Sequence, residues 1–307
     1  MRRKFQVHIL GSSAATPTSL RHTTAQVLAY NNKYFLLDCG EGTQMQLRRL
    51  KLPMMKIDHI FISHLHGDHY LGLPGLLFSL HLLGRKKDLN VYAPLGMQQI
   101  IEVQFTLSQL VPMYKVIFHE LTAGRQHIYE DRYLNVETME MEHRIPAYGF
   151  LIKEKEMNRN LRKESILKYK IPREQMAAIK DGADLVRPGG KTIPNHEITE
   201  APPRPRSYAF CSDTAYTEKF LQQIKGADLL YHEATFLHDK AAIAAEKTHS
   251  TTIEAAMLAQ KAGVKQLLLG HYSARYNDLE MFTEEARQVF TSTQLAEEGK
   301  VFQVGEE

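Results

Sequence analysis

The residues with the clearest chemistry lie in one short segment, Ser63-His64-Leu65-His66-Gly67-Asp68-His69, which has the spacing H-x-H-x-D-H. Imidazole and carboxylate groups are ligands that suit Zn²⁺. The segment directly follows a short apolar run, and Gly67 allows a sharp turn in its middle. Because four donors on one tight turn can face two directions, we expect this segment to serve two adjacent metal ions. For the four residues together, this interpretation is favoured over that of ordinary polar surface residues.

Three more potential ligands stand at the ends of predicted strands farther along the chain. His143 closes an alternating apolar segment, Asp213 follows Phe210-Cys211-Ser212, and His271 follows Leu269-Gly270. Each of the two histidines, taken alone, has a structural explanation. Their order and their strand-end positions after the H-x-H-x-D-H segment favour metal binding.

Strands and helices that could position these residues alternate along most of the chain. Alternation predicts a strand over 5–10, and the asparagine-containing turn 31–33 predicts a hairpin between strands 25–30 and 34–38. Apolar periodicity and glycine or proline stops predict the other elements. These are strands at 57–63, 89–93, 116–121, 208–212, 227–231 and 266–270, and helices at 44–50, 71–83, 96–110 and 251–262. This order predicts a layered α/β domain with sheets inside and helices outside.

Residues 153–206 differ in composition from the rest of the chain. They contain six of the 12 prolines and few strand-like runs, which predicts an inserted arm outside the core. They also contain 13 Lys and Arg against 8 Asp and Glu, a local net charge of +5, which leaves −2 for the remainder of a chain whose total is +3. A basic protrusion suits contact with RNA phosphates, although charge alone is equally consistent with a solvated loop.

The overall composition is that of a globular protein with a sizeable core. The chain has 307 residues, of which 43% are hydrophobic and 24% are charged. No apolar run approaches the roughly 18 residues of a membrane span. The basic start Met1-Arg2-Arg3-Lys4 precedes a segment too short and too polar for a signal peptide, so we expect a cytoplasmic protein with no membrane partner. Cys39 and Cys211 are too few for a disulfide framework.

The H-x-H-x-D-H segment and the three later strand ends resemble the signature of the metallo-β-lactamase superfamily. The resemblance implies a four-layer αββα sandwich, here one domain over 1–307 with an inserted flexible arm at 153–206. It also implies two zinc ions in each subunit. One zinc would be held by His64, His66 and His143, the other by Asp68, His69 and His271, with Asp213 bridging the two.

Several other segments are similar to the ribonuclease Z family, the endonucleases that process the 3′ ends of transfer RNA. They are 10–17 (LGSSAATP), 37–44 (LDCGEGTQ), 231–235 (YHEAT), 248–251 (THST) and 270–276 (GHYSARY). The family implies removal of the 3′ trailer from precursor transfer RNA, with a 3′-hydroxyl left on the transfer RNA and a 5′-phosphate on the trailer. The sequence departs from the family at Ser19, where a lysine is frequent, so no phosphate contact is carried over to that position.

Phosphodiester hydrolysis needs an activated water, neutralisation of the phosphate and a proton for the leaving group. Two metal ions roughly 3.5–4 Å apart can supply the first two. Asp68 is expected to orient or deprotonate the water while it binds metal. The family resemblance assigns the proton to His249, held and polarised by Glu233. The alternative role of His249 as a helix N-cap is better filled by Ser250 or Thr251.

We therefore predict a zinc-dependent endoribonuclease whose basic arm grips the body of precursor transfer RNA. A homodimer is the family expectation, since the arm of one subunit would present RNA to the site of the other. The alternatives are a hydrolase of small phosphodiesters or esters, which has no use for the arm, and a catalytically silent RNA-binding scaffold. The arm residues predicted to contact RNA are Arg159, Lys163, Lys168, Lys170, Arg187 and Lys191.

Overall fold

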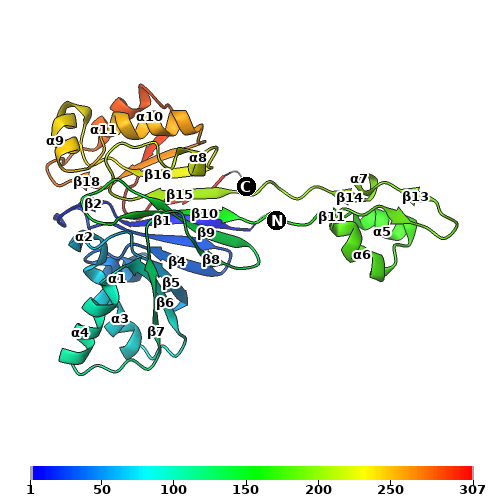
Figure 1. The fold of residues 1–307 in the computed structure, drawn as a ribbon, viewed down its shortest axis with the longest axis horizontal. Helices are drawn as coiled ribbons and strands as arrows, with labels where there is room; N and C mark the ends of the chain where they lie inside the picture. The colour runs from blue at the N-terminus through cyan, green and yellow to red at the C-terminus, as the bar shows by residue number, and fades with distance from the viewer. Residues whose placement is uncertain (1–2, 306–307) are drawn as a thin grey trace.

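Two β-sheets face each other at the centre of the protein (Figure 1). The structure, a computed structural model, describes residues 3–305. Over these residues the first sheet has the strand order β20 (Val301–Gln303), β1 (Phe5–Gly11), β3 (Ala25–Tyr30), β4 (Lys33–Leu37), β5 (Ile57–Phe61), β6 (Leu89–Pro94), β7 (Val116–Leu121). The second has the order β19 (Thr293–Leu295), β17 (Leu267–Gly270), β16 (Leu229–Glu233), β15 (Ser207–Cys211), β10 (Tyr148–Glu154), β9 (Leu134–Glu140), β8 (His127–Glu130).

Each sheet combines a parallel half with an antiparallel half. Strands β4 to β7 are parallel in the first sheet, and β15, β16, β17 and β19 are parallel in the second. The hairpin predicted from the asparagine turn is the antiparallel pair β3–β4. Because neighbouring parallel strands end at the same edge of a sheet, residues that follow β4 and β5 are brought together in the first sheet, and residues that follow β15, β16 and β17 in the second.

The space between the sheets is filled by aromatic and aliphatic side chains. Phe61 of the first sheet lies 5.3 Å from Phe150 of the second, measured between ring centroids. Phe150, Phe210 and Tyr231 then follow one another across three strands, with centroid distances of 6.3 and 5.0 Å. These rings are 1% exposed or less, so they form the centre of the core.

Helices cover the outer face of each sheet. The first sheet is covered by α1 (Thr43–Arg49), α3 (Gly72–Leu82) and α4 (Met97–Leu107), whose apolar residues pack with those of β3 to β6. The second is covered by α8 (Leu221–Ile224), α10 (Thr252–Ala262) and α11 (Glu280–Arg287). The predicted four-layer αββα sandwich is therefore confirmed. Among residues 3–305, none of the helices combines the length and the apolar character needed to cross a bilayer.

Short elements complete the body near one end of the sandwich. The strands β2 (Ser13–Ala14) and β18 (Tyr272–Ser273) form a small parallel pair that joins the N-terminal loop to the segment after β17. Two further short α-helices and two 3₁₀ turns lie in the connections within residues 3–305. They are η1 (Met54–Lys56), α2 (Gly67–Tyr70), η2 (His238–Lys240) and α9 (Ala241–Glu246).

The C-terminal residues form one helix and two short strands. Helix α11 packs against α10, but β19 then adds a strand beside β17, and β20 adds one beside β1. The C-terminal segment thus extends both sheets. Its strands have three residues each, too few for a clear alternating pattern, which is why the sequence did not reveal them.

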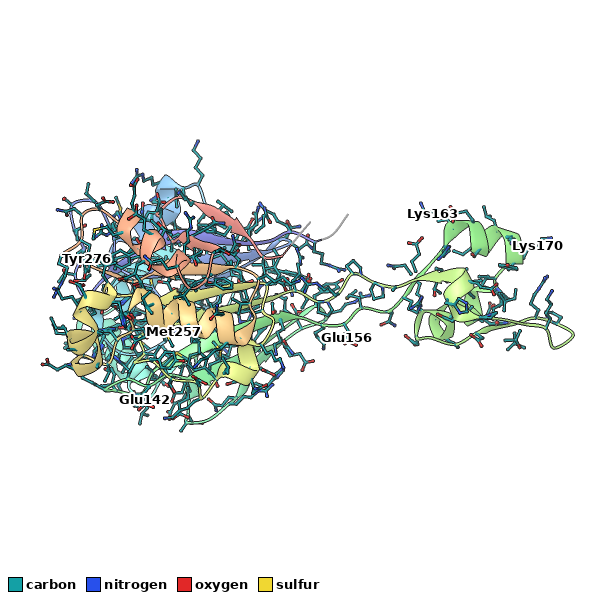
Figure 2. The ribbon with its side chains drawn as sticks, turned by 90° about the horizontal axis from the view of Figure 1, so that it is seen from above. Glu142, Glu156, Lys163, Lys170, Met257 and Tyr276 are labelled. Carbon is teal, nitrogen blue, oxygen red and sulfur yellow. The ribbon has the colours of Figure 1, made fainter. Side chains whose placement is uncertain are left out.

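The inserted segment ends in a small folded lobe that stands away from the body (Figure 1). Five isoleucine and leucine side chains form its own apolar cluster: Ile171, Ile179, Leu185, Ile193 and Ile198. The sequence showed few regular elements here, but the structure has several short ones. They are β11 (Asn160–Leu161), α5 (Lys163–Tyr169), α6 (Arg173–Lys180), β12 (Leu185–Val186), β13 (Thr192–Ile193), α7 (Asn195–Ile198) and β14 (Thr199–Glu200). Figure 2 shows two extended chain segments connecting this lobe to the body.

Candidate metal centre

The predicted metal ligands meet at one end of the sandwich. His64 and His66 follow β5, and Asp68 and His69 lie in the turn of α2. The remaining three follow β9, β15 and β17 of the second sheet: His143, Asp213 and His271. The ligands therefore follow strands of both sheets and lie close together at the same end of the sandwich.

The first group of donor atoms is compact. The Nδ1 atom of His66 lies 3.0 Å from Nε2 of His64 and 3.2 Å from Nε2 of His143. The carboxylate of Asp213 approaches the same group, with Oδ2 at 3.6 Å from His64 Nε2. All four ligand atoms lie within 4.8 Å of one another.

The second group lies beside the first and shares Asp213. The Nε2 atoms of His69 and His271 are 3.3 Å apart, and Asp68 Oδ2 lies 3.4 and 3.3 Å from them. Asp213 Oδ1 lies 3.3 and 3.2 Å from the same two nitrogens. That oxygen is buried without a hydrogen bond of acceptable geometry among the described residues, as expected of an atom that faces a cation.

These distances fit zinc. Two ligands about 2.0–2.1 Å from a tetrahedral zinc ion are separated by about 3.3 Å, close to the spacings between the donor atoms above. The seven residues predicted as ligands therefore have the chemistry and spacing of two adjacent sites.

Burial keeps the first group of imidazoles neutral. It is the main cause that lowers the pKa of His64 well below its usual value, and it also lowers the pKa of His66 and His143. The neutral imidazole is the form that binds a metal ion. The buried side chains are therefore poised to act as ligands.

His69 has the opposite electrostatic environment. Burial would lower its pKa, but the carboxylates of Asp213, Asp68 and Asp38 outweigh burial and raise it well above the usual value. Despite its own burial, Asp213 has a pKa well below its usual range because His271, His69 and His64 surround it. The carboxylates thus favour positive charge in this part of the site, from a proton or from a metal ion.

Within residues 3–305, each imidazole of the two sites except His66 has a hydrogen-bond partner on its outer nitrogen. His69 Nδ1 lies 2.7 Å from Asp38 Oδ2, and His64 Nδ1 lies 3.0 Å from Ser63 Oγ. The outer nitrogens of His143 and His271 lie 2.9 Å from the Thr248 carbonyl and from Thr235 Oγ1, respectively. Such contacts fix the orientation of metal-binding histidines.

The sequence predicted no role for these supporting residues. Asp38 and Thr235 lie within the family-like segments LDCGEGTQ and YHEAT. Asp38 is fully buried and has a φ of 56°, a strained backbone conformation for a residue with a side chain. It accepts hydrogen bonds from the backbone N and the hydroxyl of Ser63, at 2.7 and 2.9 Å. The feature of the sequence that could have indicated this role of Asp38 is an acidic residue directly after an apolar strand.

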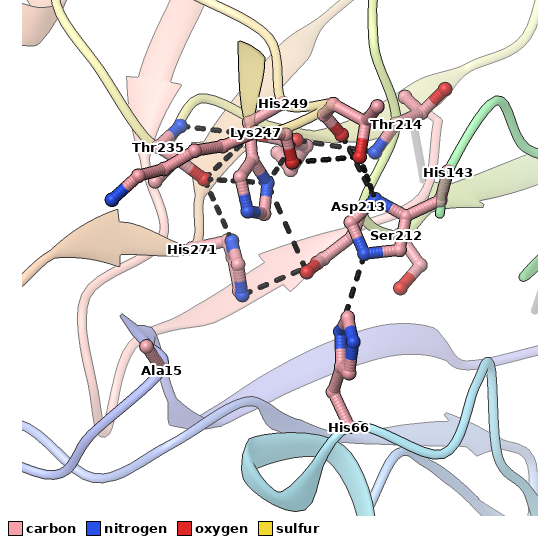
Figure 3. Close-up of polar contacts among 12 residues, drawn as sticks. Ala15, His66, His143, Ser212, Asp213, Thr214, Thr235, Lys247, His249 and His271 are labelled. Carbon is pink, nitrogen blue, oxygen red and sulfur yellow. Dashed lines mark hydrogen bonds and ion pairs between the residues drawn. The ribbon is translucent and has the colours of Figure 1, made fainter. Parts of the chain in front are cut away.

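His249 lies beside this centre (Figure 3), in contact with the fully buried Glu233. His249 Nδ1 is 2.9 Å from Glu233 Oε1, and the His249 side chain is 13% exposed. Its other ring nitrogen makes no hydrogen bond with any residue from 3 to 305, so it can face a substrate. Burial lowers the pKa of His249, but Glu233 outweighs burial and raises it to about 9. The helix N-cap is Thr251, which forms a capping box with Glu254, so His249 is not needed for that role.

The arm residues predicted to contact RNA lie far from these groups, mainly in the lobe. Five of the six are exposed: Lys163, Lys168, Lys170, Arg187 and Lys191. Arg159 differs because it is partly buried and its Nε donates a hydrogen bond of 2.6 Å to Thr199 Oγ1. Part of its guanidinium therefore supports the lobe itself.

Known proteins resemble this chain over its whole length. A family model described as Anti-Pycsar protein Apyc1 matches residues 5–159. A ribonuclease Z of Bacteroides thetaiotaomicron is 45% identical over 296 residues, covering 96% of this chain and 94% of that protein. The crystal structure of human tRNase Z, short form, has a TM-score of 0.73 and 27% identity, and covers 98% of this chain and 100% of that one.

The fold is further supported by the metallo-β-lactamase fold protein YhfI from Bacillus subtilis. Its structure matches with a TM-score of 0.70 at 19% identity, covering 98% of this chain and 100% of that one. The predicted fold is thus confirmed. The Apyc1 family model covers just over half of the chain, including the H-x-H-x-D-H segment. With 45% identity to a ribonuclease Z over nearly the full length of both proteins, this chain belongs to the ribonuclease Z family.

Proposed function

We propose that this protein is the endoribonuclease that removes the 3′ trailer from precursor transfer RNA. One observation carries the proposal. In a member of the ribonuclease Z family, seven ligand-type residues lie together, next to an imidazole, His249, that is bound to a carboxylate. The products are a 3′-hydroxyl on the transfer RNA and a 5′-phosphate on the trailer. A transfer-RNA substrate supports the further proposal of a cytoplasmic enzyme.

We propose two zinc ions for each subunit. His64, His66 and His143 would hold one, Asp68, His69 and His271 the other, and Asp213 both. When bound, such a pair supplies an activated water near neutral pH and neutralises charge on the phosphate. The donor spacings, the neutral imidazoles and the free Asp213 Oδ1 support this assignment.

The protein groups would then orient the reaction and move one proton. The backbone N–H of Ala15 donates a 2.7 Å hydrogen bond to Asp68 Oδ2, which fixes the carboxylate that orients the attacking water. His249, kept protonated by Glu233, donates the proton from Nε2 to the leaving 3′-oxygen. The Glu233 carboxylate stays ionised because it also accepts hydrogen bonds from the backbone N–H groups of Thr214, Thr235 and Ser250.

The arm is proposed to bind RNA for the site of a second subunit. It leaves the body after β10 and returns before β15, whereas Asp213 lies just beyond the other end of β15. Six residues of extended chain separate Arg206 from the vicinity of Asp213, roughly 20 Å at about 3.3 Å per residue. The lobe extends away from the metal centre (Figure 1), so the site of a partner is the nearer target for RNA held on it.

An exposed apolar surface supports a homodimer. Leu82 at the end of α3 and Leu107 at the end of α4 are each 80% exposed, and Val111 is 82% exposed. Met113 is 48% exposed and lies beside the end of α3, where its backbone N–H donates a hydrogen bond of 3.2 Å to His81 Nδ1. Helices α3 and α4 contact each other, with the ring centroids of Phe78 and Phe105 5.7 Å apart. Exposed apolar side chains on adjoining elements are typical of protein contacts, and we propose a second copy of this chain as the partner.

The decisive test is cleavage of a precursor transfer RNA with a 3′ trailer by the zinc-loaded protein. We expect one cut near the discriminator base, and no cut by Asp68→Ala. Turnover of a small phosphodiester without precursor cleavage would support the alternative hydrolase. Deleting the arm should abolish precursor cleavage but spare the small substrate.

A further inference from the structure

One hydroxyl joins the proton donor to a metal-ligand residue. Thr235, 4% exposed, lies in the loop two residues beyond Glu233. Its Oγ1 is 2.8 Å from Glu233 Oε2, 2.9 Å from His271 Nδ1 and 3.3 Å from His249 Nδ1. Figure 3 shows Thr235 beside both imidazoles, with His271 reaching toward Asp213.

Counting donors fixes the direction of these hydrogen bonds. Glu233 receives four N–H groups, three from the backbone and one from His249, and acts only as an acceptor. The single hydroxyl proton of Thr235 must therefore be donated to Glu233 Oε2. The hydroxyl oxygen can then only accept, so the hydrogen between Thr235 and His271 belongs to His271 Nδ1.

This direction leaves His271 Nε2 without a hydrogen. That nitrogen is the one that faces the other ligand atoms, 3.3 Å from Asp68 Oδ2 and 3.2 Å from Asp213 Oδ1. If the hydrogen moved to Nε2, the lone pair would point at Thr235, and the imidazole could not bind a metal ion.

We propose that Thr235 is a positioning residue that holds His271 in its metal-binding tautomer and connects it, through Glu233, to the proton donor His249. The inference rests on the proposed role of His271 as a zinc ligand. It explains why a polar side chain is buried at this point and why the YHEAT segment ends in a threonine. A residue that only filled space here would need no hydroxyl.

The test compares Thr235→Val, which keeps the shape, with Thr235→Ser, which keeps the hydroxyl. A matched control is Thr24→Val, because Thr24 is 1% exposed and its hydroxyl has no hydrogen bond within residues 3–305. Zinc affinity of the metal-free proteins is measured by competition with a chromophoric chelator. For Thr235→Val we expect one zinc ion to bind about 10- to 100-fold more weakly, and for Thr235→Ser and Thr24→Val nearly wild-type affinity.

Nitrogen NMR of the histidines in zinc-loaded wild-type protein gives a readout that does not depend on folding of a variant. We expect hydrogen on Nδ1 of His271; hydrogen on Nε2 would overturn the inference. Equal zinc affinities of Thr235→Val and wild type would overturn it as well. His271→Ala distinguishes failure of the ligand assignment from failure of the Thr235 proposal. If His271→Ala still binds two zinc ions tightly, His271 is not a ligand. If His271→Ala loses one zinc ion but Thr235→Val does not, only the role of Thr235 is refuted.

Discussion

Replacing Glu154 with glutamine should weaken the place where the arm joins the body. Glu154 ends β10 and Arg206 precedes β15, so this ion pair ties together the chain segments that enter and leave the arm. Glu154 accepts hydrogen bonds from the Nη2, the Nε and the backbone N of Arg206, at 2.7, 3.0 and 2.9 Å. The hydroxyl of Tyr30 in the first sheet adds a fourth, at 3.0 Å.

The size of the effect follows from the burial of Arg206. Its side chain is 2% exposed and that of Glu154 is 12% exposed, so the guanidinium cannot turn to water when its partner is lost. Removing one partner of a buried ion pair costs about 3–5 kcal/mol, because the other charge stays buried. Glutamine keeps one acceptor oxygen but directs an NH₂ group at a donor. We therefore expect a loss near the lower end, about 3 kcal/mol of unfolding free energy.

Denaturant unfolding of the full chain measures this loss, with Glu156→Gln as the control. Glu156 lies two residues farther into the arm and is exposed, so its variant should match wild type within about 0.5 kcal/mol. Zinc content should be unchanged in both, because the pair lies at the opposite end of the sandwich from the metal centre. Equal stability of Glu154→Gln and Glu156→Gln would refute the reasoning.

The same pair should make stability depend on pH. Burial would raise the pKa of Glu154, but its hydrogen bonds with Arg206 and the attraction of that charge outweigh burial and lower it. A carboxyl whose pKa is lowered by folding contributes its full stability above the unfolded pKa, about 4.3, and loses it as pH falls through the folded pKa. The wild-type advantage over Glu154→Gln should therefore shrink below pH 4. A constant difference from pH 7 to 3 would contradict this.

Three further predictions concern the proposed reaction. Glu233→Gln should lower kcat for precursor cleavage at least about 100-fold while the protein keeps zinc, and a wild-type rate would argue against His249 as the proton donor. A strong chelator should stop cleavage of both precursor and small phosphodiester, with recovery on adding zinc; activity that survives complete metal removal would reject the metal mechanism. Alanine at Lys163, Lys168 and Lys170 should weaken precursor binding. The slope of log affinity against log salt concentration should become shallower by roughly one for each phosphate contact that is lost, and an unchanged slope would show that these lysines do not contact RNA.

The sequence predicted the elements of the body that have strong local signals. The strand at 116–121 has the predicted bounds, and the helix predicted at 251–262 differs from α10 by one residue. Strand β10 was not predicted, since it is buried through most of its length and shows no alternation of apolar and polar residues. The lobe of the arm was also not predicted, because its helices of seven and eight residues depend on five apolar side chains from distant positions.

What the sequence predicted by itself is the set of seven ligand-type residues, and the family resemblance added the proposed proton-donor pair, His249 and Glu233. Their types and order along the chain carry that information, since His64, His66, Asp68 and His69 are neighbours on one turn. The tertiary structure decided which groups hold them. Asp38 reaches His69 because β4 and β5 end side by side in the first sheet, and Thr235 reaches His271 because β16 and β17 end side by side in the second. The tertiary structure also decided that the basic segment is a folded lobe directed away from its own metal centre (Figure 1). Hydrogen-bond direction and distance between strand ends are properties of the packed sandwich, and no local pattern of residues encodes them.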